Sequence, residues 1–530
     1  MMLVGYVSDE FYVAIPNVEL EFTRGDVSVA ARSRASGSVY ATVEPGPYRV
    51  YLSCAGYTPK WVDLEVRPGT IHHFRLLSDN ICGYVWPKWT RSGETGQVRL
   101  HSPHDSVVTL WRYGWEREFV SKLGHFSDEP RGAYAQILPD GDVTQSGVKW
   151  SNHGYSYPEV DPRVYVDAPE RSGLYYFHAK DTTGAFFSFP WIVAPRERRH
   201  RLAVLASNIN WNCYNHYGGR SNYVSAISLS PRPHFNFRQE EVYYTDPALQ
   251  PWTADEYDPL SFDRPEPLNM TEENGRITDP MERRGEEHVA PAEWRLLGWL
   301  EREGFGYDYY AETQLHSGEM PLDDYDVLII STHPEYWTAE MYYLVKSWVF
   351  DGGGKLMVLG GNSLNCEVEF LDPSTITVRN NDHRKRPANY ESRFGTRHES
   401  EAHLTGVVTT HTGYETGAPY RVIDPSHWAL AGTGLAEGEV FGTESLDRRA
   451  PGGASGHETD KRTPSSPPGI QLIAKGTNPD DGGAEMVYHE TDSGGEVFSV
   501  GSISYTCSIA VDEMISKVTR NVLERFLGSP

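Results

Sequence analysis

A chain of 530 residues is too long for a single hydrophobic core and is expected to fold as about three domains. Hydrophobic residues at 39% and aromatic residues at 12% can build packed interiors, which excludes a wholly disordered chain. The formal net charge of −25 repels nucleic-acid phosphates and anionic lipid surfaces, so neither is expected as a partner.

The N-terminal segment and the cysteines bear on the cellular compartment. Residues 1–22 lack a basic start, and acidic residues interrupt each apolar run before about 18 residues accumulate, so neither an export signal nor a membrane span is expected. The five cysteines are odd in number and widely spaced, without a CxxC pair. This usage favours a reducing cytoplasm and disfavours a thiolate zinc site or an iron–sulfur cluster.

The first part of the chain has the pattern of two β-sandwiches. Residues 1–78 alternate apolar and polar side chains in short runs between turn residues. The order of these runs resembles carboxypeptidase-regulatory-like, prealbumin-type modules, and a packing or interface role is expected in preference to carbohydrate binding. Residues 79–197 continue with runs about ten residues apart, which predicts a second, immunoglobulin-like sandwich. The basic segment 195–201 is expected to be a solvated linker.

Residues 198–530 change to alternating strands and helices. Apolar runs predict strands that each end in a polar loop, at 202–206, 327–332 and 355–359. Apolar side chains at helical spacing predict helices at 291–303, 338–351 and 511–527, with glycines such as Gly304 as stops. This alternation predicts a parallel, doubly wound sheet whose ligands lie at the carboxyl ends of its strands.

Residues 372–480 interrupt the alternation before two late strands and the closing helix. The segment is rich in glycine, proline, serine and charge, and residues 447–469 have the least regular pattern. We expect an insertion with an exposed, mobile loop, which acts either as a lid or as a passive surface excursion.

Several common catalytic motifs are absent. The sequence lacks GxSxG, GxxxxGK[ST], HExxH and GxGxxG, which disfavours serine hydrolase, P-loop, zinc protease and dinucleotide-binding functions. The order of elements after residue 198 resembles class I glutamine amidotransferase-like folds, in which a catalytic cysteine follows the strand matching 355–359. Here Gly360, Gly361 and Asn362 occupy that turn. Cys366 lies beyond it and is expected to be a small buried hydrophobe.

Two loops concentrate the side chains that can ligate or hydrogen-bond: residues 212–223 (NCYNHYGGRSNY) and 332–337 (THPEYW). With the segments 293–305 (EWRLLGWLEREGF) and 353–369 (GGKLMVLGGNSLNCEVE region), they resemble the large (beta) subunit of N,N-dimethylformamidase over roughly residues 202–527. The resemblance implies hydrolysis of a small formamide to formate and an amine at a mononuclear iron, as Fe³⁺. It also implies a small-subunit partner, with homo-oligomerisation as a further expectation; alternatively, the N-terminal module substitutes for that contact.

The same resemblance assigns residue roles. Tyr214 matches the first tyrosine ligand, Glu335 the glutamate ligand, His333 a histidine beside the metal and Asn362 an asparagine of the pocket. The second tyrosine falls where the match is poor, so Tyr257 is chosen by approximate spacing, with Tyr243 and Tyr244 as alternatives.

These residue types suit the chemistry. Phenolate and carboxylate oxygens are hard anionic donors that match a ferric ion, and three of them leave positions open for water and an amide carbonyl. Asn362 could then stabilise the developing oxyanion, and His333 could relay a proton to the leaving amine.

Each assignment has a structural alternative. Tyr214 could pack beneath its loop, His333 could only hydrogen-bond within its loop, and Glu335 could serve the N-terminus of a helix beginning near Trp337. Gly218 and Gly219 suit a positive-φ turn under either reading. The rival functions are a catalytically inactive amidotransferase-like scaffold and a hydrolase of another C–N bond.

Overall fold

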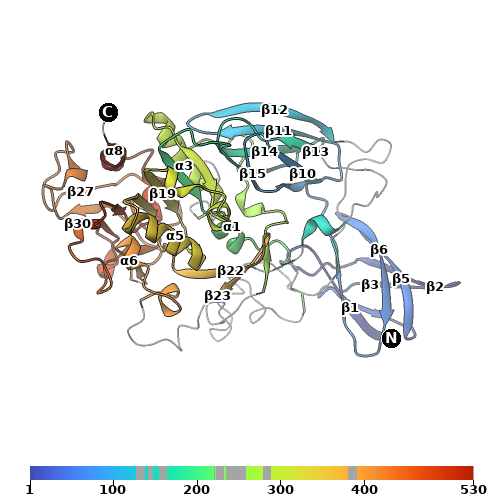
Figure 1. The fold of residues 1–530 in the computed structure, drawn as a ribbon. Coiled ribbons are helices and arrows are strands. Elements are labelled where there is room, and N and C mark those ends of the chain that lie inside the picture. Colours follow the sequence, from blue (N-terminus) through green and yellow to red (C-terminus); the bar gives the residue numbers. More distant parts are fainter. Residues whose placement is uncertain are drawn as a thin grey trace.

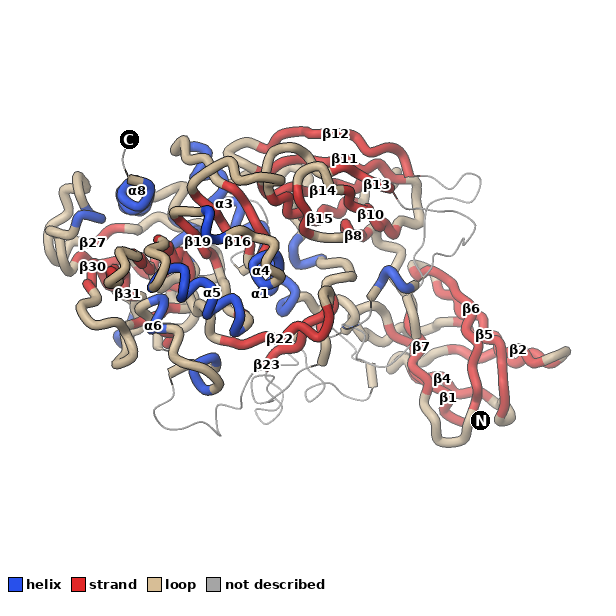
Figure 2. The backbone as a smooth tube through the Cα atoms, viewed as in Figure 1, coloured by secondary structure: helices blue, strands red, loops and turns tan. Residues whose placement is uncertain are grey.

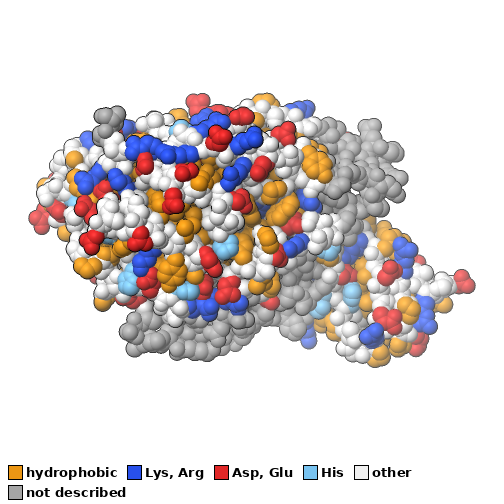
Figure 3. Space-filling view, in the orientation of Figure 1, with side chains coloured by type: hydrophobic (Ala, Val, Ile, Leu, Met, Phe, Trp, Pro, Cys, Tyr) orange, Lys and Arg blue, Asp and Glu red, His pale blue; other side chains and the backbone are white. Residues whose placement is uncertain are grey.

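The computed structural model describes residues 1–126, 138–140, 147, 149–153, 164–219, 221–222, 232–233, 258–278, 288–379, 391–410 and 412–528. Within these ranges the protein is mostly β-structure in several sheets, with some helices. Figure 1 shows one β-sandwich as a lobe at the N-terminal end and a second sandwich beside the helix-containing region. On the face drawn in Figure 3, acidic and basic side chains are interspersed.

The first sandwich contains two sheets, with strand orders β4-β1-β7 and β3-β2-β5-β6. Its strands are β1 (Met2–Ser8), β2 (Glu19–Arg24), β3 (Val27–Arg32), β4 (Ser38–Ala41), β5 (Gly46–Cys54), β6 (Tyr57–Val66) and β7 (His72–Arg75). Alternation places Leu20 and Phe22 inward, where they share one core with Val7 and Phe74 of the facing sheet. The predicted runs therefore form a sandwich, with β3 and β7 as additional strands.

The second sandwich pairs the sheet β13-β10-β8 with the sheet β12-β11-β14-β15-β9. Its strands are β8 (Cys82–Trp86), β9 (Trp89–Arg91), β10 (Thr95–His101), β11 (Ser106–Tyr113), β12 (Arg117–Phe126), β13 (Val164–Asp167), β14 (Gly173–Asp181) and β15 (Phe186–Ala194). Val98 and Leu110 from opposite sheets meet in its core beside Phe177 and Trp191. Residues 196–201 are exposed, as a solvated linker should be.

A nine-stranded sheet, in the order β18-β16-β19-β21-β32-β31-β30-β26-β27, organises the rest of the chain. Its strands are β16 (Leu202–Ala206), β18 (Asp308–Ala311), β19 (Val327–Thr332), β21 (Lys355–Gly360), β26 (Tyr420–Val422), β27 (Val440–Phe441), β30 (Gln471–Gly476), β31 (Glu485–Glu490) and β32 (Glu496–Ser499). The first five strands in this order pair in parallel and the others antiparallel. The predicted parallel sheet is therefore present, with an antiparallel extension.

Helices cover both faces of this sheet. One core contains Val204 and Ile329 with α3 (Ala290–Arg302), α7 (Ser504–Ser508) and α8 (Glu513–Leu527). The other contains Leu205 and Ile330 with α1 (Asn208–Tyr214), α4 (Glu312–His316) and α5 (Ala339–Phe350). Successive residues of a strand thus face opposite helical layers, which explains why these strands are continuous apolar runs. Figure 2 draws α1, α4 and α5 of this second layer in blue.

A smaller sheet, β17-β23-β22-β20, borders the carboxyl edge of the large one. Its strands are β17 (Leu260–Ser261), β20 (Tyr336–Trp337), β22 (Cys366–Asp372) and β23 (Thr375–Arg379). Among the described residues, the strands and α-helix that remain are two short antiparallel pairs and one helix. The pairs are β24 (Val408–Thr410) with β29 (Thr459–Lys461) and β25 (Gly417–Ala418) with β28 (Ser455–Gly456), and the helix is α6 (Ala402–Thr405).

The exposed loop predicted for residues 447–469 is wrong for its central part. Ser455, His457 and Asp460 are at most 1% exposed, and β28 and β29 both lie in this part. The glycines permit close backbone packing: a Cβ at Gly453 would lie 2.5 Å from the carbonyl carbon of Ala418. The larger insertion also contributes β26, β27 and β30 to the main sheet.

The polar loop predicted directly after β16 is also wrong, because Asn208–Tyr214 forms the helix α1. The sequence gives no apolar periodicity there, since the helix is buried on almost every side. Neighbouring backbone satisfies its amides: the Asn210 side chain donates to the His288 carbonyl at 2.8 Å, and that of Asn212 donates to the Leu260 carbonyl at 3.3 Å. Because these side-chain amides bond to other segments, they do not compete for the backbone hydrogen bonds of α1.

Candidate active site

Three segments that follow strands of the parallel sheet meet at its carboxyl edge. Tyr214 ends α1, which follows β16; His333 and Glu335 follow β19; and Asn362 follows β21. These strands are direct neighbours, in the order β16-β19-β21, so their carboxyl ends lie side by side. The topology thus brings together side chains separated by more than a hundred residues in the chain.

Tyr214, His333 and Glu335 contact one another. The Tyr214 hydroxyl oxygen lies 3.0 Å from Nε2 of His333 and 3.3 Å from Oε2 of Glu335. His333 Nε2 is 3.1 Å from the same carboxylate oxygen. His333 and Glu335 are almost fully buried, whereas Tyr214 is partly exposed. Tyr214 therefore hydrogen-bonds through its hydroxyl in addition to packing through its ring.

The second nitrogen of His333 is also engaged. Nδ1 lies 3.0 Å from the Gly361 carbonyl and can donate to it, which orients the ring. Burial alone would lower the pKa of His333, but Glu335, Glu458 and the Gly361 carbonyl outweigh it and raise that pKa. An imidazolium here would direct Nε2–H toward Tyr214 and Glu335. His333 is therefore a loop hydrogen-bonder on one side and part of the cluster on the other.

The other oxygen of Glu335 meets a different pair of side chains. Cys366 Sγ donates to Oε1 at 3.6 Å, and the Arg393 guanidinium lies 3.7 Å from Oε1. Arg393 also donates to Cys366 Sγ at 3.4 Å. Glu335 does not act at the start of α5, where Thr338 is the cap and accepts from the Met341 amide. Cys366 is fully buried, as predicted.

Residues 456–460 (GHETD) supply side chains near the cluster that were not predicted from the sequence. Glu458 Oε2 lies 3.8 Å from His333 Nε2, and burial raises the pKa of this carboxyl, which also lies next to Asn362. Asp460 accepts from the backbone amide of Asn362 at 2.8 Å and so holds the turn after β21. Asn362 adopts a positive φ of 50° in that turn, and among the described residues its buried Oδ1 has no hydrogen-bond partner.

Two more histidines line the cluster. The His288 ring packs against His333 with ring centroids 5.0 Å apart and against Tyr214 at 5.4 Å. His457 packs on His288 at 4.3 Å, and both rings are buried. Neither residue has a local sequence signal, because His288 precedes α3 and His457 lies in the segment predicted to be an exposed loop. Only the folded structure shows that His288 and His457 lie beside the cluster.

Buried polar groups fix α1, which carries Tyr214. Glu293 accepts from the backbone amide of Ser207 at the start of α1 and from the Trp211 indole, both at 2.9 Å. Arg264 donates to the backbone and side-chain oxygens of Asn212 at 3.3 and 3.0 Å. The helix is thus held at both ends by ionisable side chains from other segments.

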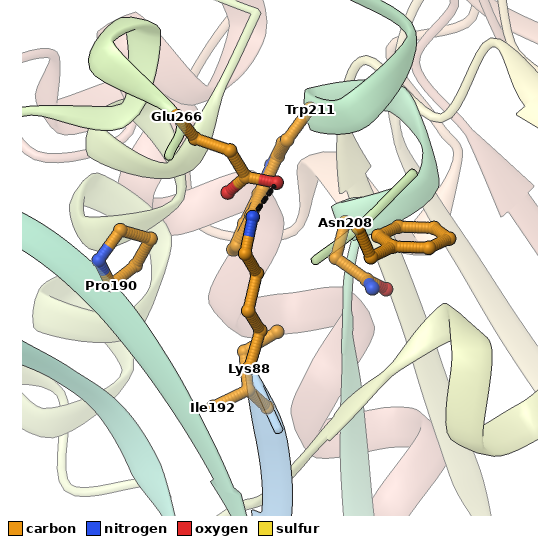
Figure 4. A pocket seen from close by; sticks show the side chains of 7 residues that line it. Lys88, Pro190, Ile192, Asn208, Trp211 and Glu266 are labelled. Atoms are coloured by element: carbon orange, nitrogen blue, oxygen red, sulfur yellow. Dashed lines mark ion pairs between the residues drawn. The ribbon is translucent and has the colours of Figure 1, made fainter. Parts of the chain in front are cut away.

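A small cavity between α1 and the second sandwich belongs to this support (Figure 4). Its volume is only about 10 Å³, close to the least that a single water molecule needs, and its lining includes Asn208 and Trp211. Across it, Lys88 Nζ lies 2.6 Å from Glu266 Oε1 and donates to the Arg264 carbonyl at 2.7 Å. Burial lowers the pKa of Lys88 to about 8, although Glu266 opposes the shift. The ion pair joins the second sandwich to the segment that holds α1.

The donor set can be compared with what a metal requires. Ligand oxygens about 2.0–2.2 Å from a shared ion lie roughly 3 Å apart, and the Tyr214 and Glu335 oxygens are 3.3 Å apart. In the described part of the chain, no three His, Cys, Asp or Glu side chains are arranged to hold a metal ion. Tyr257, Tyr243 and Tyr244 lie outside the described residues.

Comparisons with known proteins agree with the predicted resemblance. The family described as N,N-dimethylformamidase beta subunit-like, C-terminal, matches residues 107–520. N,N-dimethylformamidase beta subunits from Paracoccus aminophilus and from Alcaligenes sp. are each 28% identical over 284 residues, which cover 45% of this chain and 37% of the relative. The match thus spans little more than a third of these relatives.

A β-galactosidase from Rahnella sp. R3 matches with 10% identity and a TM-score of 0.26 over 45% of this chain and 27% of that chain, a likeness too weak to support an argument. Within the described ranges, no helix is long and apolar enough to cross a membrane. Because the family match covers most of the chain, the protein belongs to the N,N-dimethylformamidase beta subunit-like family.

Proposed function

We propose that this chain is a metal-dependent hydrolase of the C–N bond of small amides, which converts a formamide and water to formate and an amine. The observation that carries the proposal is the contact of Tyr214, His333 and Glu335 at the carboxyl edge of the sheet. A phenol and a carboxylate that meet beside a histidine supply both hard oxygen donors and a proton carrier.

In this proposal Tyr214 and Glu335 hold a mononuclear iron, as Fe³⁺, with Tyr257 as the third ligand. A ferric ion held there would polarise the amide carbonyl and lower the pKa of bound water. Arg393 keeps the second oxygen of Glu335 directed away from the Tyr214 side, since it lies 3.7 Å from Oε1. The ligand oxygen is thereby oriented before any ion arrives.

Other residues of the site transfer protons and bind the carbonyl oxygen of the substrate. Glu458, whose pKa is raised by burial, is placed to accept a proton from the attacking water. Before this transfer, the Glu335 and Glu458 carboxylates stabilise the protonated form of His333. After Glu458 has taken the water proton, His333 donates its own proton to the nitrogen of the leaving amine as the C–N bond breaks. Asn362 can donate through its side-chain amide to the carbonyl oxygen as negative charge develops there. Burial of the cluster strengthens each of these interactions.

We also propose that residues 198–530 form an amidotransferase-like domain with altered chemistry, preceded by sandwich domains at 1–78 and 79–197. The parallel order β16-β19-β21 supports this, with the site at the turn after β21. That turn has Asn362 in place of a nucleophile, and Cys366 is buried beyond it. Since the relatives are named beta subunits, the proposal includes a small-subunit partner. It also includes homo-oligomerisation and, from the widely spaced cysteines, a cytoplasmic location.

The test is hydrolysis of N,N-dimethylformamide by the purified full chain, with formate and dimethylamine measured separately. Equimolar products are expected, and both Glu335→Gln and His333→Asn should reduce kcat by about 100-fold or more. Glu340→Gln removes an exposed carboxylate from α5 and should leave the rate unchanged. No product from protein loaded with iron, with or without a small subunit, would instead favour an inactive scaffold.

A further inference from the structure

The first sandwich contacts the loop that directly follows Tyr214. The Gly218 amide donates to the Glu10 carbonyl at 2.8 Å, and Arg75 donates to the Gly218 carbonyl at 3.4 Å. The Phe11 ring packs on His216 at 5.3 Å between centroids. Glu10 and Phe11 lie in the connection between β1 and β2, residues 9–18, which we call the docking turn.

The docking turn is itself rigidly built. The Asp9 carboxylate accepts from the amides of Phe11 and Val13 at 2.8 and 2.9 Å, which closes the turn. Arg75 is fully buried and donates through Nε to the Asp9 carbonyl at 3.0 Å. A buried guanidinium that bridges Asp9 and Gly218 therefore links the turn to the loop.

A second contact, at Asp140, helps to fix the orientation of the first sandwich relative to the rest of the chain. Asp140 lies between the modules, where its carboxylate pairs with Lys60, lies 2.7 Å from His72 Nε2 and accepts from the Arg75 amide at 2.9 Å. Lys60 also donates to the Leu138 carbonyl at 2.7 Å. Buried, mutually bonded charges demand a specific geometry, since any displacement leaves one of them uncompensated.

Because residues 215–219 directly follow Tyr214, contacts that hold this loop also restrict the position of Tyr214. Tyr217 is buried in the core of the second sandwich, where Phe11 packs edge-on against its ring. Gly218 and Gly219 have φ values of 97° and 101°, as predicted, and form the turn that the first sandwich contacts. Only three residues separate Tyr214 from Gly218, so a displaced loop would move the end of α1.

We propose that the first sandwich is a positioning module for Tyr214, with Phe11 and Arg75 as its positioning residues. The inference rests on the proposed role of Tyr214 in the site. It assigns the module a task within its own chain, in place of binding a separate partner or a carbohydrate. Undocking should then disturb the phenol oxygen, because a displacement of about 1 Å can cost roughly 100-fold in rate.

The test compares three full-length variants. Phe11→Ala removes the ring that contacts His216 and Tyr217, and Phe11→Leu keeps most of its bulk. Trp61→Ala is the control, because Trp61 is a 53% exposed aromatic of the same module that packs on Tyr51. Hydrogen exchange of the peptide covering residues 212–219 reports docking directly, and thermal unfolding reports global stability.

For Phe11→Ala we expect exchange at residues 212–219 to rise by about tenfold and kcat for formamide hydrolysis to fall by about tenfold, without a matching change at β19 or β21. Phe11→Leu should recover most of both, and Trp61→Ala should change neither. Unchanged exchange in Phe11→Ala would overturn the docking, and faster exchange with an unchanged kcat would overturn the positioning role. If the wild-type chain proves inactive, the proposed function fails, while the exchange comparison still decides whether the module orders the loop.

Discussion

Replacing Glu293 by glutamine should make the stability of the α/β region less sensitive to pH. Glu293 is 1% exposed and accepts hydrogen bonds from the Ser207 amide, the Trp211 indole and the Tyr309 hydroxyl, the last at 2.6 Å. Burial, the largest influence, raises the pKa of Glu293 from 4.5 to about 7 against the effect of these donors.

The sign follows from the protons bound in each state. Between 4.5 and about 7, the folded protein retains a proton on Glu293 that the unfolded chain has released. The stability associated with this proton is fully present below about pH 4.5 and is lost as the pH rises through 7. At about 1.4 kcal/mol for each pKa unit, the interval corresponds to a loss of about 3 kcal/mol.

Glutamine has nearly the same shape and no charge to titrate. Its carbonyl can accept from Ser207 and Trp211, and its amide can donate to the Tyr309 hydroxyl, which then acts as acceptor. Urea unfolding followed by tryptophan fluorescence should show the two proteins within about 1 kcal/mol at about pH 5 and the wild type less stable by up to about 3 kcal/mol at about pH 8. The exposed Glu319→Gln is the control for loss of one charge. A wild-type-to-Glu293→Gln difference that stays constant over this range would refute the reasoning.

Three further changes test other parts of the account. Glu458→Gln should lower kcat by about 100-fold while bound iron is retained, as metal analysis would show; loss of the iron would mean that Glu458 is a ligand. Thr338→Ala removes the acceptor of the Met341 amide at 3.2 Å and should cost about 1 kcal/mol in urea unfolding, a loss that Thr338→Ser should not share. Leu523→Ala, at a fully buried position of α8, should cost about 2–5 kcal/mol in the same assay, and a cost as small as that of the 38% exposed Val511→Ala would contradict its place in the core.

Much of the fold could be predicted because its signals are local. Each of β16, β19 and β21 contains at least four consecutive apolar residues, because both faces of the parallel sheet are covered by helices. Helices α3 and α8 have apolar stripes, and Gly304 follows α3 in a left-handed conformation. Once the parallel sheet is expected, the convergence of the loops after its strands follows from topology.

The rest could not be predicted, because its causes are not local. Helix α1 is stabilised by tertiary hydrogen bonds to Glu293 and Arg264, which no periodicity reveals. The glycine-rich strip around Gly453 looks like a surface loop, but its small residues allow the backbone to pass through the interior and carry Glu458 to His333. A glycine-rich composition does not indicate an exposed loop where the glycines are needed for close backbone packing rather than for flexibility.

The central claim is that Tyr214 and Glu335 share one ferric ion. The most direct measurement is the metal content and the visible spectrum of the full chain, in the wild type and in Tyr214→Phe. Tyr505→Phe is the control, because it removes a buried hydroxyl whose described hydrogen bond is to Thr519. We expect about one iron per chain and a visible charge-transfer band that Tyr214→Phe weakens or shifts, because Tyr257 remains as a phenolate ligand, and that Tyr505→Phe preserves. An active protein without iron, or a band unchanged in Tyr214→Phe, would contradict the account.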